Sequence, residues 1–256
     1  MLLKDKVCLI AGAASRRGIG YATAQLFVEH GAKVVVIDIA MNENTVEAMK
    51  TGIAKMPEGI GDIHGIQCDI TSIADCRRVV ENIVTRYGTI DCLVNSAGIV
   101  RGTPLLGIED TEFDLVLDVN LKGAFNLCKS VLPVMVAAKK GAIVNLASAA
   151  AQRGGGLVGG AHYAASKGGV ISLTRTIARE FGPQGIRANV ICPAMIETSM
   201  LDGLPNDRVQ DIISTIPLQR TGEPHEAAGA CLFLASDLSG FVTGATIDVN
   251  GGSHIH

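Results

Sequence analysis

The sequence predicts an α/β fold in which a parallel sheet of seven strands is covered by helices on both faces. Short runs rich in β-branched residues alternate with longer helical stretches along the 256 residues. Hydrophobic residues make up 48% and aromatic residues only 4%, so aliphatic side chains, Ala and Gly must pack the core. Because no linker, repeat or low-complexity tract divides the chain, we expect a single domain over 1–256.

The strand-like runs are short and evenly distributed, and helical material separates each from the next. Helical crossovers between strands make the sheet parallel and place helices on both of its faces. We expect strands at 6–12, 33–38, 63–68, 90–95, 142–147, 187–191 and 245–249.

The first helix follows the first strand in the stretch GIGYATAQLFVEHG. We expect Gly31 to be its C-cap, and a shared buried face made by Ile19, Ala22, Leu26 and Phe27. Longer helices are expected near 109–137 and from Tyr163 to about Phe181.

Composition and charge argue against several classes of protein. The formal net charge is −3 and no basic block could follow a phosphate backbone, so we expect no nucleic-acid partner. No apolar run reaches the roughly 18 residues that a membrane span needs, so we expect no membrane span, and we read the apolar N-terminus as a buried strand rather than a signal peptide. Seven scattered cysteines without a C-x-x-C pair predict reduced thiols in a cytoplasmic protein, with no metal site.

A glycine-rich loop, Gly12-Ala-Ala-Ser-Arg-Arg-Gly18-Ile-Gly20, lies between the first strand and the first helix. Backbone N–H groups and the positive helix end can face a pyrophosphate there, and the missing side chains allow close approach. A glycine loop alone is a weak signal, but its position between strand and helix makes a dinucleotide site the favoured interpretation.

Asp38 ends the second strand 18 residues after Gly20. A carboxylate there can accept hydrogen bonds from both adenosine ribose hydroxyls and would repel a 2′-phosphate, which favours NAD over NADP. Arg16 and Arg17 favour the opposite, because a loop arginine can pair with a 2′-phosphate. Either arginine could equally face the pyrophosphate or solvent.

Tyr163-Ala-Ala-Ser-Lys167 places a phenol and an ammonium one helical turn apart on one face. A nearby cation favours the phenolate, so we expect Lys167 to lower the pKa of Tyr163 from its usual value near 10. The spacing alone is common and usually marks a solvated helix face. Two more polar residues accompany it: Ser148 at the carboxyl end of an expected strand and Asn120 within an amphipathic helix.

With these motifs in this order, the chain resembles the short-chain dehydrogenase/reductase family along nearly its whole length. Asn120, Ser148, Tyr163 and Lys167 match the family's catalytic tetrad. Similar stretches are Asp69 in CDIT, Asn95-Ser-Ala-Gly98, Pro193-Ala-Met-Ile-Glu-Thr198 and the ending FVTGATIDVNGG. The resemblance implies a doubly wound Rossmann fold, with cofactor contacts from Gly12, Ser15, Arg17, Gly18, Ile19, Gly20, Asp38, Asp69, Ile70, Asn95, Ala97, Gly98, Tyr163, Lys167, Pro193, Ile196 and Thr198.

The resemblance also implies a mechanism. Tyr163 exchanges a proton with the substrate oxygen while hydride moves between the substrate carbon and nicotinamide C4. Ser148 hydrogen-bonds the same oxygen, Lys167 holds the ribose hydroxyls, and Asn120 positions a water that links Lys167 to solvent.

Two positions depart from the family pattern. The glycine loop has two residues more than usual, a length closer to the enoyl-reductase branch. That branch needs a lysine at position 170, where this chain has Val170, so we keep the ketone and alcohol chemistry. The second departure is Ala194 where glycine is usual.

We therefore expect an NAD(H)-dependent oxidoreductase that interconverts a secondary alcohol and a ketone, acting on a small polyol or hydroxy compound. An alternative is a 3-oxoacyl-carrier-protein reductase using NADPH. For it, Lys139 and Lys140 would serve one of two carrier-facing places, but Gln184 occupies the other. A third reading is a non-enzymatic nucleotide-sensing protein on the same fold.

The substrate pocket is expected from 149–160, His162, Met195 and 197–216, within a substrate-loop segment at about 194–216. His162 could be a second proton carrier, although a place in the pocket wall or an interface is favoured. We also expect a homotetramer. The helices near 109–137 and 162–181 are apolar around much of their circumference, and the resemblance implies that they pair across a two-fold axis while the C-terminal strand region forms a second contact. The residues that suggest this on the second helix include Ala164, Ala165, Val170, Ile171 and Leu173.

Overall fold

Seven parallel strands form a sheet in the order β3-β2-β1-β4-β5-β6-β7. This computed structural model describes residues 1–53, 62–155 and 158–255. The strands are β1 (Val7–Ala11), β2 (Lys33–Asp38), β3 (Ile63–Gln67), β4 (Cys92–Asn95), β5 (Gly141–Leu146), β6 (Ile186–Pro193) and β7 (Thr246–Val249). All seven predicted strands are confirmed, and so is the doubly wound Rossmann fold.

The order of the strands reverses beside β1. The chain moves outward from β1 to β2 and β3, and then returns to place β4 on the other side of β1. Ligands of open α/β sheets bind at such a reversal, outside the carboxyl ends of the strands.

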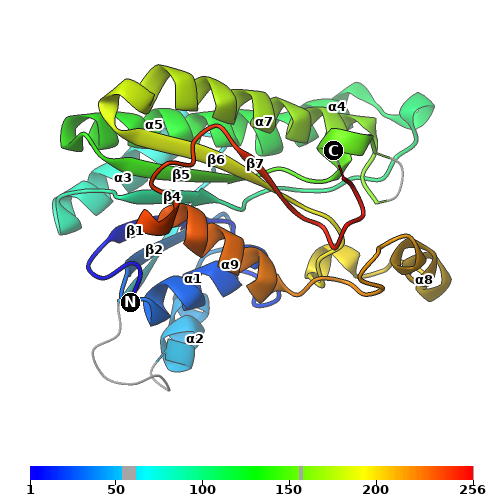
Figure 1. Cartoon of the computed structure of the whole chain (residues 1–256), viewed down its shortest axis with the longest axis horizontal. Helices are drawn as coiled ribbons and strands as arrows, with labels where there is room; N and C mark the ends of the chain where they lie inside the picture. The colour runs from blue at the N-terminus through cyan, green and yellow to red at the C-terminus, as the bar shows by residue number, and fades with distance from the viewer. Residues whose placement is uncertain (54–61, 156–157, 256) are drawn as a thin grey trace.

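Helices cover both faces of the sheet (Figure 1). On one side lie α3 (Ile73–Tyr87), α4 (Asp110–Leu117), α5 (Gly123–Ala138) and α7 (Ala161–Phe181). On the other lie α1 (Ile19–Glu29), α2 (Glu43–Ile53) and α9 (Pro224–Ala235). The short α6 (Ala150–Arg153) follows β5, and α8 (Asn206–Ser214) stands beyond the layers, within the predicted substrate-loop segment.

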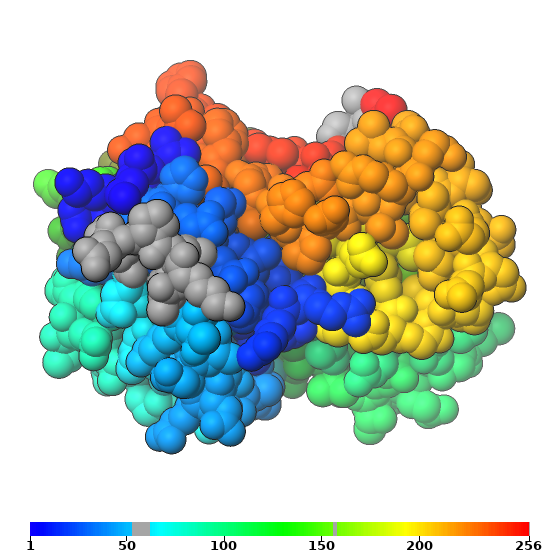
Figure 2. All heavy atoms as spheres, turned by 90° about the horizontal axis from the view of Figure 1, so that it is seen from below, coloured from blue at the N-terminus to red at the C-terminus, as the bar shows by residue number. Residues whose placement is uncertain are grey.

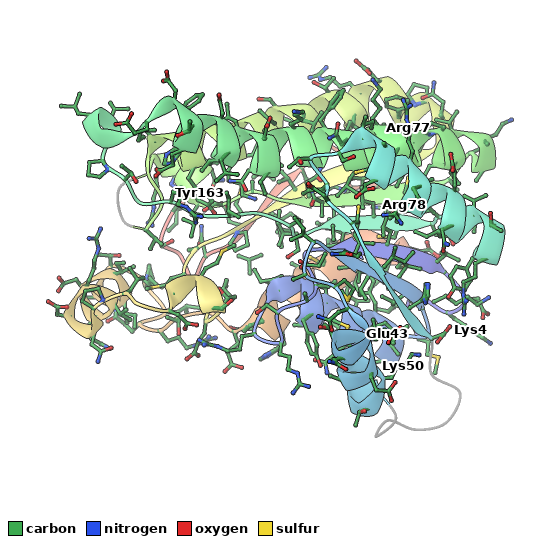
Figure 3. All side chains as sticks on the ribbon, turned by 180° about the vertical axis from the view of Figure 1, so that it is seen from behind. Lys4, Glu43, Lys50, Arg77, Arg78 and Tyr163 are labelled. Carbon is green, nitrogen blue, oxygen red and sulfur yellow. The ribbon has the colours of Figure 1, made fainter. Side chains whose placement is uncertain are left out.

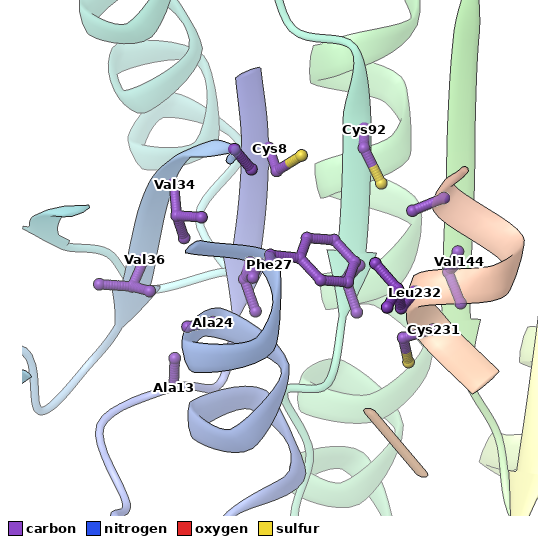
Figure 4. Close-up of a cluster of buried hydrophobic side chains, with 14 of the residues drawn as sticks. Cys8, Ala13, Ala24, Phe27, Val34, Val36, Cys92, Val144, Cys231 and Leu232 are labelled. Atoms are coloured by element: carbon purple, nitrogen blue, oxygen red, sulfur yellow. The ribbon is translucent and has the colours of Figure 1, made fainter. Parts of the chain in front are cut away.

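Each face of the sheet has its own apolar core. Figure 4 shows Phe27 of α1 and Leu232 of α9 against the strand residues Cys8, Cys92 and Val144. The opposite cluster joins side chains of α3, α5 and α7 to the other face of the same strands. Because alternate residues of each strand point to opposite faces, a sheet covered on both sides needs almost continuous apolar runs, as in β1 and β2.

The buried face of α1 differs from the prediction. Tyr21, Ala24, Phe27 and Val28 are buried, whereas the predicted Ile19, Ala22 and Leu26 are only partly buried. The buried stripe is therefore displaced around the helix, and of the four predicted residues only Phe27 lies fully within it.

The end of α1 also lies one residue earlier than predicted. His30 is the C-cap, and Gly31 is the following residue, with a φ of +85°. A left-handed residue immediately after the cap is the usual place for glycine, because it has no Cβ to clash.

The predicted helix at 109–137 is present but is not regular. A π-helical turn, Asp118–Lys122, separates α4 from α5. By length and composition, the run Asp110–Ala138 could cross a membrane, and half of its most apolar window is buried inside the protein. The prediction that no run reaches this length and hydropathy was therefore wrong. In the fold, apolar residues of α5 such as Leu127, Val131 and Met135 pack into the core cluster beside α3 and α7.

The apolar residues of α7 were partly misread. Val170 and Ile171 are buried within the chain against Ala124, Val190 and Cys192, so they are not free to join a partner. Leu173 is partly buried against the same core. Ala165 is exposed and Ala164 is half-buried.

The cysteines agree with the sequence reading of their role. All seven are buried and none is in a disulfide. Cys8, Cys92 and Cys231 belong to one core cluster and Cys68, Cys76 and Cys128 to the other, where they pack as small apolar side chains.

Candidate active site

A cavity of about 860 Å³ lies along the carboxyl ends of the strands, where the strand order reverses. Its wall includes many residues predicted from the sequence: Gly12, Ser15, Gly18, Ile19, Asp38, Asp69, Ile70, Ala97, Gly98, Ser148, Tyr163, Lys167, Pro193, Ile196 and Thr198. Four predicted residues do not line it: Arg17, Gly20, Asn95 and Asn120. A smaller cavity of about 440 Å³ lies at the amino ends of the strands and contains none of the predicted catalytic or cofactor-binding residues.

The glycine loop leaves bare backbone facing the cavity. Gly12 has a φ of +78°, and a Cβ there would collide with the backbone of Ala97 at the end of β4. A Cβ on Gly20 would collide with the carbonyl of Gly12, so Gly20 acts beneath the loop rather than in the cavity wall. The loop closes with a hydrogen bond from the Gly18 N–H to the Ser15 carbonyl, at 2.8 Å. Such a surface at a helix N-terminus fits an anionic pyrophosphate.

Asp38 is held rigidly at the end of β2. Its Oδ2 accepts the N–H of Ala14 at 3.1 Å, and its Oδ1 accepts the N–H of Ala40 at 3.0 Å. The carboxylate therefore ties the glycine loop to the second strand, with lone pairs left toward the cavity. Asp69, at the end of β3, is fixed similarly, because its Oδ1 accepts both the N–H and the hydroxyl of Thr71.

Arg17 is paired with a carboxylate other than that of Asp38. Its Nη1 lies 2.9 Å from Asp202 Oδ1 and 3.1 Å from Oδ2, so the glycine loop contacts the segment that follows β6. Ser15 and Ser199 meet beside this pair, with 3.3 Å between their hydroxyl oxygens. Figure 2 shows the blue N-terminal loop against this yellow segment. Both charged side chains are more than half exposed, so the pair contributes little to stability.

Ser148 is positioned by strand pairing that continues beyond β5. Its neighbours Ala147 and Ala149 donate backbone hydrogen bonds to the carbonyls of Ile191 and Pro193, at 2.9 Å each. The Ser148 Oγ accepts the N–H of Ala150 at 3.1 Å, and the hydroxyl also hydrogen-bonds Tyr163.

Tyr163 lies in the first turn of α7 and points into the cavity (Figure 3). Gly159 lies against its ring, where a Cβ would collide with Cδ1. Burial raises the pKa of Tyr163 above its usual value, and the hydrogen bond with Ser148 partly offsets this by lowering it. The expectation that Lys167 lowers the pKa of Tyr163 was therefore wrong for the protein alone. Desolvation of the phenolate is the larger effect.

Lys167 is buried one turn after Tyr163. Its ammonium donates to the Leu146 carbonyl at 2.9 Å, and burial lowers the pKa of Lys167 to about 8. Cys192 is close to both side chains, but burial raises the pKa of Cys192 to about 12, so it is a neutral thiol rather than a nucleophile.

Asn120 lies behind the cavity wall on the π-helical turn. Its Oδ1 accepts the Ile99 N–H at 2.8 Å, and its Nδ2 donates to the Ile99 carbonyl at 2.9 Å and to Ser166 Oγ at 3.1 Å. Asn120 thus joins the segment after β4 to the helix that carries Tyr163. A Cβ on Gly98 would lie 3.0 Å from Asn120 Oδ1 and 3.1 Å from Lys167 Nζ, so glycine there leaves room between the two groups.

The segment after β6 completes the cavity wall. Ile196 pairs with Gly222 in an isolated parallel bridge, and the Thr198 Oγ1 accepts the Met200 N–H at 3.3 Å. Ala194, the departure from the family's glycine, donates its N–H to the Val249 carbonyl and lines the cavity without disrupting it.

Asn95 is buried at the end of β4, beneath the cavity floor. Its Oδ1 has no hydrogen-bond partner among the residues that the structure describes.

His162 does not line the cavity. It is buried between α7 and α4, and its Nε2 lies 2.9 Å from Glu112 Oε1. The predicted place in the pocket wall was therefore wrong. The side chain at 162 projects from a different face of the helix from Tyr163, because adjacent helical residues are rotated by about 100°.

Several cavity residues were missed by sequence reasoning. Val100 and Arg101 follow β4, and Leu115 and Val119 come from α4 and the π-helical turn. The position of Val100 and Arg101 directly after Gly98, at the carboxyl edge of the sheet, could have indicated the first two. Of the predicted substrate wall, Ala149, Ala150, Arg153, Val158, Gly159, Met195, 198–201 and Ile212 line the cavity, and residues 156–157 lie outside the described residues.

Over 1–53, 62–155 and 158–255, no group of three or more His, Cys, Asp or Glu side chains is arranged to hold a metal ion.

Comparison with known proteins gives the same family along the whole chain. Residues 12–254 match the family model described as enoyl-(acyl carrier protein) reductase. An uncharacterized short-chain type dehydrogenase/reductase of Sinorhizobium fredii is 43% identical, with 100% of both chains covered. The 3-oxoacyl-[acyl-carrier-protein] reductase FabG of Thermotoga maritima is 43% identical over 98% of this chain and 99% of its own length, and that of Escherichia coli is 36% identical over 100% of both.

A solved structure is also similar. The crystal structure of gox2181 superposes with a TM-score of 0.88 at 31% identity, covering 98% of this chain and 96% of its own. These relatives, together with the assembled cavity, show that the chain belongs to the short-chain dehydrogenase/reductase family and is an oxidoreductase acting on CH–OH groups with NAD or NADP.

Proposed function

We propose that this enzyme oxidises a secondary alcohol to a ketone with NAD, and catalyses the reverse reaction with NADH. The observation that carries the proposal is the arrangement of the cavity. Ser148, Tyr163 and Lys167 meet at one end of it, and the fixed carboxylate of Asp38 lies at the other. A dinucleotide that spans the cavity would have its nicotinamide beside the tetrad and its adenosine ribose beside Asp38.

The tetrad residues divide the chemistry between them. A bound nicotinamide ring supplies or accepts the hydride at its C4. In the oxidation direction, Tyr163 takes the hydroxyl proton as the substrate carbon loses hydride, and in reduction it returns that proton to the carbonyl oxygen. Ser148, already hydrogen-bonded to Tyr163, would hold the same oxygen.

Lys167 and Asn120 support the proton transfer. The Lys167 ammonium is close enough to the cavity to bind ribose hydroxyls, and its charge stabilises the phenolate when the site is closed by cofactor. Asn120 fixes the Ile99 backbone beside Gly98, and we propose that a water beside its amide connects Lys167 to solvent.

The preference for NAD rests on Asp38 and on the direction of Arg17. The Asp38 carboxylate would repel a 2′-phosphate, and the guanidinium of Arg17 is bound to Asp202 instead of facing Asp38. Of the two loop arginines that could favour NADP, Arg16 is therefore the one left to pair with a 2′-phosphate, and its side chain is exposed.

A second candidate is reduction of 3-oxoacyl-carrier-protein with NADPH. Its support is the name of the Thermotoga maritima and Escherichia coli relatives, at 43% and 36% identity. Lys139 and Lys140 are exposed after α5 and would face a carrier, while Gln184 is uncharged at the second place. Enoyl reduction is disfavoured, because Val170 is buried in an apolar cluster where that branch needs a lysine.

A purely nucleotide-sensing role has less support, because all four tetrad residues are present and three of them line the cavity. The unpaired cysteines support a reducing compartment, and we propose a cytoplasmic location.

We also propose that the enzyme is a homotetramer. On α4 and α5, Phe113 and Phe125 are 41% and 45% exposed, and Leu106 before α4 is fully exposed. A separate surface near β7 exposes Leu238 and Phe241. Two distinct apolar surfaces on one chain fit two isologous contacts, which combine into a D₂ assembly.

A cofactor comparison tests the proposed function. Purified enzyme is assayed on a panel of secondary alcohols and ketones with NAD(H) and NADP(H) in parallel, following nicotinamide absorbance, and Asp38→Ala is assayed beside it. We expect the wild type to prefer NAD, and Asp38→Ala to lose NAD efficiency and gain NADP efficiency, each by about tenfold or more. Wild-type preference for NADPH, with activity confined to 3-oxoacyl thioesters, would establish the second candidate instead.

A further inference from the structure

The cavity carries opposite charges at its two ends. Asp38 and Asp69 lie at the ends of β2 and β3, on one side of the strand-order reversal. Arg101 and Arg153 lie after β4 and β5, on the side of Ser148 and Tyr163. No Asp or Glu among the described residues lines this second end.

Arg101 is presented by a segment that is tied to the loop preceding Tyr163. Its carbonyl accepts the Gly160 N–H at 2.7 Å, and Gly102 lies against the Val158 carbonyl. Among the described residues, the hydrogen bond of the guanidinium is to the carbonyl of its own neighbour Val100, at 2.9 Å. The backbone is therefore fixed next to the catalytic tyrosine, while the charged group stays free to bind a ligand.

Arg153 also lines the cavity and is exposed. It ends α6, the short helix that begins two residues after Ser148, and its N–H donates to the Ala149 carbonyl. Its Nη1 reaches the Ser253 carbonyl at 3.5 Å, a long contact with a neutral acceptor. Within the part of the chain that the structure describes, neither Arg101 nor Arg153 forms an ion pair with a carboxylate, although four other arginines there do.

Between these arginines and the tetrad, the wall is mainly apolar. Val100, Leu115, Val119, Met195, Leu201 and Ile212 surround this part of the cavity. Two exposed guanidiniums at the mouth of an apolar chamber suit a ligand with an apolar body and an anionic end.

We propose that the substrate carries an anionic group, bound by Arg101 and Arg153 at the mouth of the cavity while its hydroxyl or ketone carbon faces Tyr163. The proposal rests on the proposed oxidoreductase function and narrows its substrate class to hydroxy and keto compounds with a carboxylate or phosphate. Guanidinium groups bind both anions through paired N–H donors, so an experiment has to distinguish a carboxylate from a phosphate.

The test compares matched ligands and matched variants. The ligands are straight-chain keto acids with one to four carbons between ketone and carboxylate, the methyl ester of each, and the coenzyme A thioester of the 3-oxo acid. The variants are Arg101→Gln, Arg153→Gln and the double variant. Arg77→Gln is the control, because Arg77 is an exposed arginine on α3, at the other end of the molecule from Tyr163 (Figure 3).

For at least one chain length, we expect the wild type to favour the acid over its ester by about tenfold in kcat/KM. Each single glutamine variant should lower kcat/KM for the acid by about tenfold to a hundredfold, with the ester and the Arg77→Gln control unchanged within about twofold. If it is instead the kcat/KM for the coenzyme A thioester that falls in the arginine variants, the anion that the arginines bind is a phosphate of coenzyme A. The anion site would be refuted if the wild type had equal kcat/KM for acids and esters, or if the variants lowered kcat/KM for both by the same factor.

A binding measurement separates this proposal from the proposed function. Keto acid and ester are titrated by calorimetry into wild type and Arg101→Gln/Arg153→Gln, each saturated with NAD, so that no hydride is available and the ketone binds without being reduced. The acid should bind the wild type about tenfold or more tightly than the double variant, and the ester equally to both. This result would support the anion site even if the enzyme reduced no ketone. The lack of reduction would contradict only the oxidoreductase reaction proposed above. Equal affinity of the acid for both proteins would refute the site.

Discussion

At the scale of single residues, burial controls the two groups that move protons. Burial raises the pKa of Tyr163 and lowers the pKa of Lys167 to about 8. Both shifts favour the neutral forms, so the phenolate needed for alcohol oxidation becomes more populated as pH rises, whereas ketone reduction uses the phenol that predominates at lower pH. We therefore expect oxidation to increase through the alkaline range and reduction to be favoured near neutrality.

Lys167→Ala tests the role of the ammonium in both cofactor binding and proton transfer. Loss of the cation should weaken NAD binding by about tenfold, lower kcat for oxidation by about a hundredfold, and move its pH dependence further into the alkaline range. NAD affinity is measured by titration, and kcat/KM is measured across pH 6 to 10. Arg179→Ala, an exposed cation in the last turn of the same helix, is the control. An unchanged NAD affinity and pH profile would show that Lys167 serves neither group.

At the scale of elements, the sequence patterns predicted the helices and strands whose positions depend on local hydrophobic periodicity. The seven strands and the long helix α7 follow from apolar runs and helical spacing, and Asp38 and Ser148 could be placed because each follows such a run. The buried stripe of α1 includes the small residue Ala24, within the core cluster that α1 shares with α9, and a pattern based on large apolar residues does not reveal the burial of small ones.

The parts that could not be predicted depend on contacts distant in the sequence. The π-helical turn at Asp118–Lys122 has an ordinary helical sequence, and it is stabilised where Asn120 bonds the Ile99 backbone. Likewise, the pairing of Arg17 with Asp202 joins residues 185 apart, and the burial of His162 depends on Glu112 from another helix. No local pattern contains this information.

At the scale of the whole molecule, the sheet and its helices position both the cavity and the exposed apolar surfaces. The strand order places the active cavity at the carboxyl edge, and the helices that flank it expose apolar side chains on two separate surfaces. Because Val170 and Ile171 are buried within the chain, the exposed apolar groups that a partner could cover include Phe113, Phe125 and Phe241.

Light scattering on a gel-filtration peak tests the tetramer. We expect a mass of four times the 26.6 kDa protomer, and Phe113→Asp/Phe125→Asp should reduce it by half because only one of the two contact surfaces is then lost. Lys33→Asp, an exposed substitution on β2 away from both surfaces, is the control. A wild-type mass equal to one protomer would refute the assembly.

The most direct test of the central claim is the turnover of Tyr163→Phe measured together with its NADH affinity. Only the phenolic oxygen is removed, so kcat should fall by about a thousandfold, while the dissociation constant for NADH, measured by fluorescence titration, stays within about threefold. Tyr87→Phe, on α3, should match the wild type in both measurements. A Tyr163→Phe enzyme that retains kcat within about tenfold of the wild type would contradict proton transfer by Tyr163 and with it the proposed mechanism.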